Sequence, residues 1–222
     1  MKKITTIAIV FIAFLLSSNA CSNDKEYVDS NNTLTQKEKT DGWELLFDGI
    51  TTDGWHKFND GKINGGWIVE NGEFIALGKG GDIGGDIISD NEYQNFDLKL
   101  EWKISPEGNS GIFYHVFEGE QYKAVYYTAP EYQLIDDVGF PGNFAEWQKT
   151  GADYSMYLAN NKKNLKKVGE WNTSRIVVVD SLVQYYLNGE KIVEFTRWTE
   201  DWHRRKSEGK WKDYPEYGMQ TK

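Results

Sequence analysis

The chain of 222 residues contains a single cysteine, Cys21, and only four prolines. A lone thiol excludes disulfide bridges and cysteine-rich zinc sites within one chain, so the folded part must depend on its hydrophobic core. Clusters of basic residues are also lacking, and the formal net charge is −9. Nucleic acids and anionic lipids are bound through Lys and Arg, so we expect neither as a partner. A neutral or cationic ligand fits this charge balance better.

Long hydrophobic runs are absent too, and the one apolar run, at residues 7–16, is too short to span a membrane comfortably. It follows Lys2 and Lys3 and precedes Ala20 and Cys21, which predicts a lipoprotein signal peptide over residues 1–20. An ordinary cleaved secretory signal is the alternative. With lipidation of Cys21, we expect a lipid-anchored protein of the cell envelope, on the periplasmic or surface face of the outer membrane.

The part after the signal divides into a tether and one domain. Residues 21–40 are polar and predict a flexible tether. Residues 41–222 are long enough for one hydrophobic core. The glycine run at residues 78–85 lacks the following helix that a phosphate-binding loop needs, so we interpret it as a loop that could border a ligand groove.

Short strand patterns dominate this domain. Residues 96–104 alternate between apolar and charged side chains, and Asn71-Gly72 and Asn188-Gly189 are typical hairpin turns. A short helix is expected only from about Glu200. These patterns predict an all-β antiparallel sandwich or barrel. Strands are expected at residues 43–47, 67–69, 73–77, 87–89, 96–104, 109–116, 129–137, 175–179, 182–187 and 191–195, with a further one around 122–127.

Two of these strands carry polar residues that a core strand avoids. Residues two apart on a strand share a face, so His115 would lie with Phe113 and Phe117, and Glu131 with Gln133. If both strands belong to one sheet, His115 and Glu131 converge on one surface. The simpler interpretations are a half-buried histidine and a carboxylate paired with a nearby lysine.

Six motifs in a fixed order resemble the 3-keto-disaccharide hydrolase family. They lie at residues 42–49 (with 54–55), 109–114, 131–136, 150–154, 169–177 and 186–189. The resemblance implies a concanavalin A/laminin G-like jelly roll of two antiparallel sheets, with a ligand groove on the concave sheet. It also implies secretion and action on glycosides oxidised at C3.

The chain departs from the family pattern in two places. Many relatives have Arg where His115 stands. Relatives also continue into a Gly-His-Ile-Gly-Leu-Gln-Asp-His-like strand, so we expect the domain at 41–222 to lack its C-terminal strand.

A ketone at C3 acidifies the hydrogen on C2, so a base can remove it and the group on C1 can leave by β-elimination. Later addition of water makes the net result hydrolysis. The reaction needs a base near C2, a group that stabilises charge on the C3 oxygen, and an acid for the leaving oxygen. We expect His115 and Glu131 to be catalytic. The same pair could ligate a divalent metal, although no cofactor is certain.

Other residues are candidates for binding the sugar. Amides and hydroxyls bond sugar hydroxyl groups, and indole rings stack on pyranose faces. Asp136 has a turn residue as its alternative role. The predicted substrate-binding residues are Asn109, Gln133, Asp136, Tyr154 and Trp171, with Trp147 as a second stacking candidate.

Two other functions remain open from the sequence. A conventional glycosidase would use two carboxylates, for which Glu101 and Glu131 are the candidates, although Glu101 also fits an exposed strand face. A non-catalytic, lectin-like carbohydrate-binding module is the second alternative, because this type of sandwich serves binders as readily as enzymes.

Overall fold

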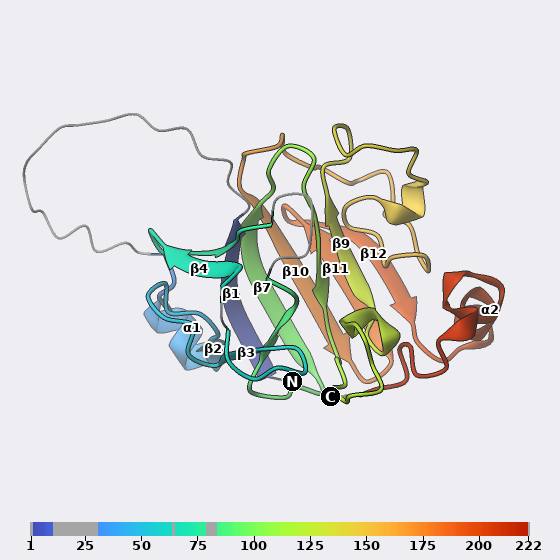
Figure 1. Ribbon diagram of the computed structural model, residues 1–222, viewed down its shortest axis with the longest axis horizontal. Helices are drawn as coiled ribbons and strands as arrows, with labels where there is room; N and C mark the ends of the chain where they lie inside the picture. Colours follow the sequence, from blue (N-terminus) through green and yellow to red (C-terminus); the bar gives the residue numbers. More distant parts are fainter. Residues whose placement is uncertain (1, 11–30, 64, 79–83, 222) are drawn as a thin grey trace, which may run out of the picture.

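The computed structural model describes residues 2–10, 31–63, 65–78 and 84–221 and has two layers of β-strands (Figure 1). The larger sheet has the strand order β12-β11-β10-β7-β1-β5-β4, with β2 paired to β1. The bounds are β1 Lys2–Val10, β2 Trp43–Leu45, β4 Trp67–Glu70, β5 Glu73–Ala76, β7 Phe96–Lys103, β10 Asn172–Val179, β11 Leu182–Leu187 and β12 Glu190–Thr196.

The hairpins of this sheet form where the turn residues predict them. Asn71 and Asn188, with φ of 52° and 47°, begin the β4–β5 and β11–β12 turns, and each precedes a glycine that is also left-handed. Such turns have the twist that antiparallel neighbours require. Asp180, at φ 52°, begins the β10–β11 turn in the same way.

β1 is the exception to antiparallel pairing, because it runs parallel to β7, β5 and β2. It lies within the stretch expected to be a signal peptide. The pairing does not test that expectation, which stays a prediction, and residues 11–20 and Cys21 lie outside the described residues.

The second layer is built on β8 (Asn109–Phe113) and β9 (Glu131–Ile135), which are antiparallel. The chain at residues 151–154 extends this layer beyond β9, since Gly151 N donates to Gln133 O at 2.8 Å and Tyr154 N donates to Glu131 O at 3.0 Å. A separate ribbon pairs β3 (Trp55–Lys57) with β6 (Ile87–Ser89).

The core lies between the two layers and is held by a buried polar link. Trp102 Nε1 donates to Ser174 Oγ at 2.8 Å, and Ser174 Oγ donates to the Tyr132 hydroxyl at 3.0 Å. Trp102 and Tyr132 are fully buried, and the Tyr132 ring lies 4.9 Å from that of Tyr185 on β11. The expected all-β, two-sheet jelly-roll sandwich is confirmed.

Two of the expected strands differ most from the structure, while others, such as 43–47 and 129–137, are shorter than expected. The strand expected at 109–116 ends at Phe113, because His115 has a left-handed φ of 53° that no strand accommodates. The strand expected around 122–127 is wrong. Val125–Tyr127 is a 3₁₀ helix, in which Tyr127 N bonds to Ala124 O within one turn.

Two α-helices flank the sandwich. α1 (Gln36–Asp41) begins with a capping box between Thr35 and Glu38 and orders the last part of the expected tether. α2 (Glu200–Glu208) begins where the sequence predicts it and leads into a 3₁₀ helix, Lys210–Asp213. None of the helices in the described part of the chain is long and apolar enough to cross a membrane.

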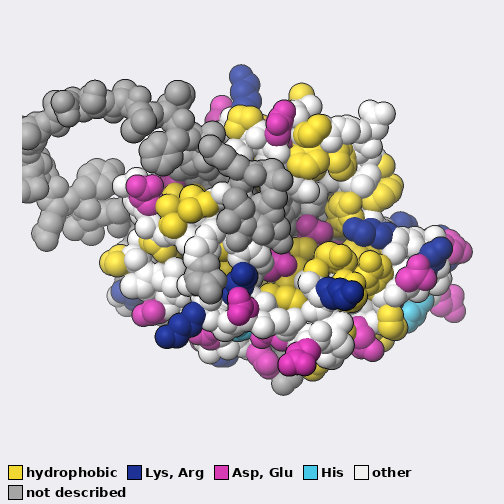
Figure 2. Space-filling view, in the orientation of Figure 1, with side chains coloured by type: hydrophobic (Ala, Val, Ile, Leu, Met, Phe, Trp, Pro, Cys, Tyr) yellow, Lys and Arg dark blue, Asp and Glu magenta, His cyan; other side chains and the backbone are white. Residues whose placement is uncertain are grey.

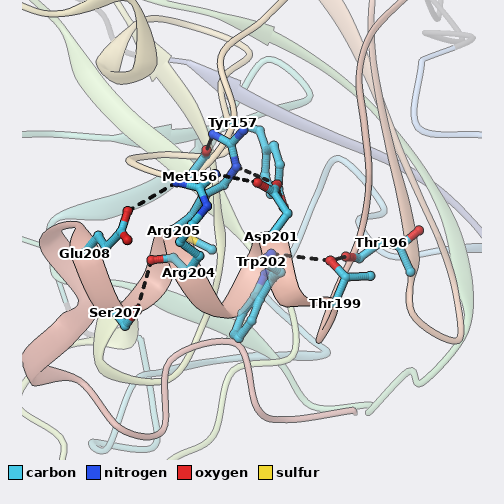
Figure 3. A network of polar contacts seen from close by, with 10 residues as sticks. All are labelled: Met156, Tyr157, Thr196, Thr199, Asp201, Trp202, Arg204, Arg205, Ser207 and Glu208. Atoms are coloured by element: carbon cyan, nitrogen blue, oxygen red, sulfur yellow. Dashed lines mark hydrogen bonds and ion pairs between the residues drawn. The ribbon is translucent and has the colours of Figure 1, made fainter.

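A polar network fixes α2 against the loop that follows residue 153 (Figure 3). Arg205 pairs with Asp201 at 2.7 Å and donates to the carbonyl of Met156 at 3.0 Å. The Tyr157 hydroxyl donates to Asp201 at 3.2 Å, and Thr199 caps the helix by accepting from Trp202 N. α2 is therefore joined to the segment that extends the β8–β9 layer.

Candidate functional site

The outward face of β8 and β9 carries the polar residues singled out in the sequence. Alternation along β9 directs Tyr132 into the core, so Glu131 and Gln133 point away from the larger sheet. Gly111 lies opposite Gln133 in the register, and a Cβ there would come within 2.2 Å of Glu131 Oε1. Glycine at this position therefore makes room for the carboxyl group.

The carboxyl group of Glu131 is partly buried. Burial raises the pKa of Glu131 to about 8, since the positive charge of Lys210 only partly offsets it and Asp86 and Asp153 raise it further. The side-chain amide of Gln133 lies 2.9 Å from Glu131 Oε1 and 3.1 Å from Asn109 Oδ1. Glu131, Gln133 and Asn109 therefore form one polar group on this face.

Lys210 faces this group from the 3₁₀ helix after α2. Its Nζ lies over the rings of Tyr154, Trp211 and Tyr126, at 4.2, 4.6 and 5.6 Å from their centroids. Burial lowers the pKa of Lys210, and the charge of Glu131 opposes this effect. Within the described residues no ion pair of 4.0 Å or less joins the two side chains, although each affects the pKa of the other.

Aromatic rings gather around Lys210 and Tyr154, next to this polar group. The ring of Tyr214 lies 5.9 Å from that of Tyr126 and 5.0 Å from that of Tyr127, and Trp147 lies 6.0 Å from Tyr154. Figure 2, in the orientation in which β9 lies in front of β10 to β12, shows hydrophobic side chains gathered beside basic and acidic ones. Trp147 is 39% exposed, so its ring is accessible to a ligand.

The structure does not bring His115 to this face. His115 is buried, its Nε2 lies 2.9 Å from Gln94 O, and its Nδ1 lies 2.9 Å from Arg197 Nη1. The arginine can only donate, so Nδ1 accepts from it and Nε2 donates to the carbonyl. Burial, followed by the charge of Arg197, lowers the pKa of His115 to about 4. The ring is neutral at pH 7, with both nitrogens already engaged.

A divalent metal shared by His115 and Glu131 does not fit this arrangement, because the histidine has no free lone pair. Across residues 2–10, 31–63, 65–78 and 84–221 no three His, Cys, Asp or Glu side chains group as a metal site. We derive no step through a metal.

Asp136 closes a turn, which is the alternative to substrate binding that the sequence allows for this residue. Its carboxylate accepts from the backbone N–H groups of Glu107, Val138 and Gly139 at 3.0, 3.1 and 2.8 Å. Burial alone would raise the pKa of Asp136, but these bonds hold it below its ordinary value. Tyr154 does lie beside the site, and its hydroxyl accepts from Gln148 Nε2 at 3.0 Å.

Trp171 lies on the opposite side of the sandwich. With Arg175 and Tyr186 it lines a hollow of about 710 Å³ on the outer face of the larger sheet, and Lys103 lies over its ring at 4.7 Å. Glu101 lines the same hollow, so a pair of catalytic carboxylates formed by Glu101 and Glu131 does not fit. The sequence does not show which strand residues lie on the outer face of the larger sheet and which lie on the outward face of β8 and β9. Both sets stand in strands of similar composition.

Lys210 is the residue that sequence reasoning missed. It is one of several basic residues among the aromatic residues that follow Trp198, and nothing in the local sequence distinguishes it. Local sequence cannot show that the end of α2 packs against β9, because that contact depends on the tertiary fold.

Known proteins resemble this chain over most of its folded part. Residues 42–218 match the model of a family described as the 3-keto-alpha-glucoside-1,2-lyase-like domain. The chain is 34% identical over 129 residues to a 3-keto-disaccharide hydrolase of Bacteroides thetaiotaomicron, covering 54% of this chain and 44% of that protein. It therefore spans less than half the length of that curated relative.

A solved structure is similar over most of the chain. It is that of a Parabacteroides distasonis protein provisionally assigned as a glycosyl hydrolase, with 43% identity and a TM-score of 0.79, covering 86% of this chain and 88% of that one. Because the family model also matches well over half of the chain, the protein belongs to the 3-keto-alpha-glucoside-1,2-lyase-like domain family.

Proposed function

We propose that this protein cleaves 3-keto-glycosides, including 3-keto-disaccharides, with Glu131 as the general base. One observation carries the proposal: the Glu131 carboxyl group lies 2.9 Å from the Gln133 amide on the face that points away from the larger sheet, and burial raises its pKa to about 8. The family match and the name of the Bacteroides thetaiotaomicron relative support the same substrate class.

The proposed reaction balances without a redox step. The Glu131 carboxylate takes the C2 proton, and the electrons of the C–H bond form an enolate whose charge lies on the C3 oxygen. The enolate restores the C3 carbonyl, a C1–C2 double bond forms, and the C1–O bond to the leaving group breaks. The leaving oxygen takes up a proton, which the Glu131 carboxyl group supplies directly or through water, so the carboxylate is restored. Water then adds its hydroxyl to C1 and a proton to C2.

The raised pKa suits this role. A base works best when its pKa lies near the working pH, because it is then partly ionised and still basic enough to take a proton. An ordinary glutamate is a much weaker base. The amides of Gln133 and Asn109 and the exposed ring of Trp147 are suited to hold sugar hydroxyls and a pyranose face.

The test compares a 3-keto-glucoside with the same glucoside before oxidation. We expect release of the leaving group from the keto substrate alone. Glu131→Gln keeps the shape and removes the base, so kcat/KM should fall by about 10²–10⁴-fold. Glu101→Gln, on the outer face, is the matched control and should retain activity.

The lectin-like alternative predicts another outcome. Sugar binding without turnover, with Glu131→Gln indistinguishable from the unsubstituted chain, would replace the enzyme by a binding module.

We further propose export and lipid anchoring at Cys21, which rests on the order of charged, apolar and small residues before it. In a bacterial host, the full chain should incorporate a labelled fatty acid and fractionate with membranes. Cys21→Ser should abolish both, and label retained by this variant would contradict the proposal.

A further inference from the structure

Lys210 is held in place by its neighbours in the chain. Gly209 ends α2, and Trp211, next to Lys210, is fully buried. Trp211 Nε1 donates to Tyr154 O at 3.0 Å, and its ring stacks on Tyr217 at 4.1 Å. The polar network in Figure 3 fixes the preceding helix. Lys210 is therefore tied to the segment that pairs with Glu131 along β9.

Among the described residues, the ammonium group of Lys210 has aromatic neighbours but no polar partner. Its three ring contacts, with Tyr154, Trp211 and Tyr126, stabilise a cation through the electron-rich ring faces. In the part of the chain that the structure describes, its Nζ makes no hydrogen bond or ion pair within the usual distances. Its N–H donors are therefore available to a ligand on this face.

Lys210 and Glu131 affect each other but do not form an ion pair. Each side chain shifts the pKa of the other, yet they are too far apart for an ion pair. Lys210 Nζ lies over the ring of Tyr154, whose backbone N–H donates to Glu131 O, so both charges act on the same part of this face. Opposite charges placed in this way can bind a group between them. A 3-keto sugar offers such a group, because the acidic C2 hydrogen and the C3 oxygen lie on adjacent carbons.

We propose that Lys210 is a second catalytic residue, whose ammonium group donates a hydrogen bond to the C3 oxygen of the substrate while Glu131 removes the C2 proton. This inference rests on the proposed function. As the C2–H electrons move into the enolate, negative charge grows on the C3 oxygen beside the ammonium group. When the C1–O bond breaks, these electrons restore the carbonyl. The lysine ends the step with its proton.

This role has a clear physical advantage over simple substrate binding. The ketone oxygen carries only a partial charge, whereas the enolate oxygen carries nearly a full one. The attraction to Lys210 is thus stronger in the transition state than in the bound substrate, which is the condition for catalysis.

The first experiment uses Lys210→Met, with Lys212→Met as the matched control. Lys212 is exposed in the same 3₁₀ helix, and within the described residues its side chain makes no hydrogen bond, ion pair or cation–ring contact. With a 3-keto-glucoside, Lys210→Met should reduce kcat/KM by about 10²–10³-fold, as expected for loss of one group that stabilises an oxyanion. Lys212→Met should stay within about twofold of the unsubstituted chain, since surface changes have small effects.

The second experiment isolates the enolate step. A 3-keto sugar without a leaving group on C1 can exchange its C2 hydrogen for deuterium but cannot eliminate. Exchange catalysed by the protein in D₂O should be slowed in Lys210→Met and lost in Glu131→Gln. Lys212→Met should exchange at the unsubstituted rate.

Lys210→Arg keeps the charge and covers the case in which Lys210→Met does not fold. The rate of the unsubstituted chain should fall at high pH as Lys210 loses its proton. In Lys210→Arg this fall should move to higher pH, because arginine stays protonated. A fall at the same pH in both proteins would overturn the assignment.

The outcomes separate this inference from the proposed function. If the unsubstituted chain cleaves the keto substrate and Lys210→Met matches Lys212→Met in turnover and exchange, Lys210 is not catalytic and the proposed function stands. If the unsubstituted chain releases no leaving group from 3-keto-glycosides, both proposals fail.

Discussion

The carboxyl group of Glu131 links catalysis to stability through its titration. An ordinary glutamate titrates near 4.5, and burial raises the pKa of Glu131 to about 8. Between these values the folded chain binds a proton that the unfolded chain has released. Linkage then requires the free energy of unfolding to fall as the pH rises from about 4.5 to about 8.

Glu131→Gln should remove this pH dependence. The amide is neutral at every pH and has nearly the same shape as the protonated acid. We expect equal stability of the two proteins near pH 4.5, and a gain for the variant on the order of 3 kcal/mol at pH 9, from about 1.4 kcal/mol per pKa unit with a discount for partial exposure. Urea unfolding at pH 4.5, 7 and 9 measures the difference. A gain that does not change with pH would contradict the raised pKa.

Among the site residues, the sequence predicts the positions of Glu131 and Gln133 but not that of His115. Alternation along one strand correctly places Glu131 and Gln133 on a shared face, since that depends only on the strand period. It fails for His115, because a single left-handed φ of 53° ends β8 and turns the ring inward toward Arg197. Nothing in the local residue types marks that angle.

At the scale of elements, the hairpins were the most predictable part. Asn71-Gly72 and Asn188-Gly189 specify their own turns, so β4–β5 and β11–β12 follow from short segments alone. The segment at 122–127 has equally strong strand formers, but within the described residues it pairs with no strand. Its backbone therefore bonds within itself as a 3₁₀ helix.

For α2, the sequence predicts where the helix begins but not where it packs. Thr199 and the acidic residues after it predict where the helix starts. Its docking depends on Arg205 reaching Met156 O, a contact between residues 49 positions apart (Figure 3). That contact brings Lys210 toward Glu131, so the second charged group of the site becomes visible only in the folded chain.

At the scale of the whole molecule, His56 joins segments that are distant in the sequence. Its Nδ1 lies 2.7 Å from Asp90 Oδ1, after β6, and its Nε2 lies 2.9 Å from Glu118 Oε2, in the connection between β8 and β9. Glu118 also accepts from Asn59 N at 2.7 Å. The histidine thus ties the β3–β6 ribbon to the layer that carries the site.

This contact should make stability depend on the charge of His56. Burial lowers the pKa of His56, but hydrogen bonds to Glu118 and Asp90 and their charges outweigh this and raise it above its ordinary value. A raised histidine pKa stabilises the fold fully below the unfolded value of 6.5, and this contribution is lost as the pH rises through the folded pKa. The carboxylates are 54% and 37% exposed, so we expect less than about 1 kcal/mol.

His56→Gln should therefore lower the melting temperature more at pH 6 than at pH 9. The neutral amide carries no positive charge to pair with the two carboxylates, whereas above its pKa the native histidine has lost the same charge. His203→Gln, at an exposed position on α2, is the control and should change the melting temperature equally at both pH values. If the effect of His56→Gln were the same at pH 6 and pH 9, the ring would join these segments by shape and neutral hydrogen bonding, and not by its charge.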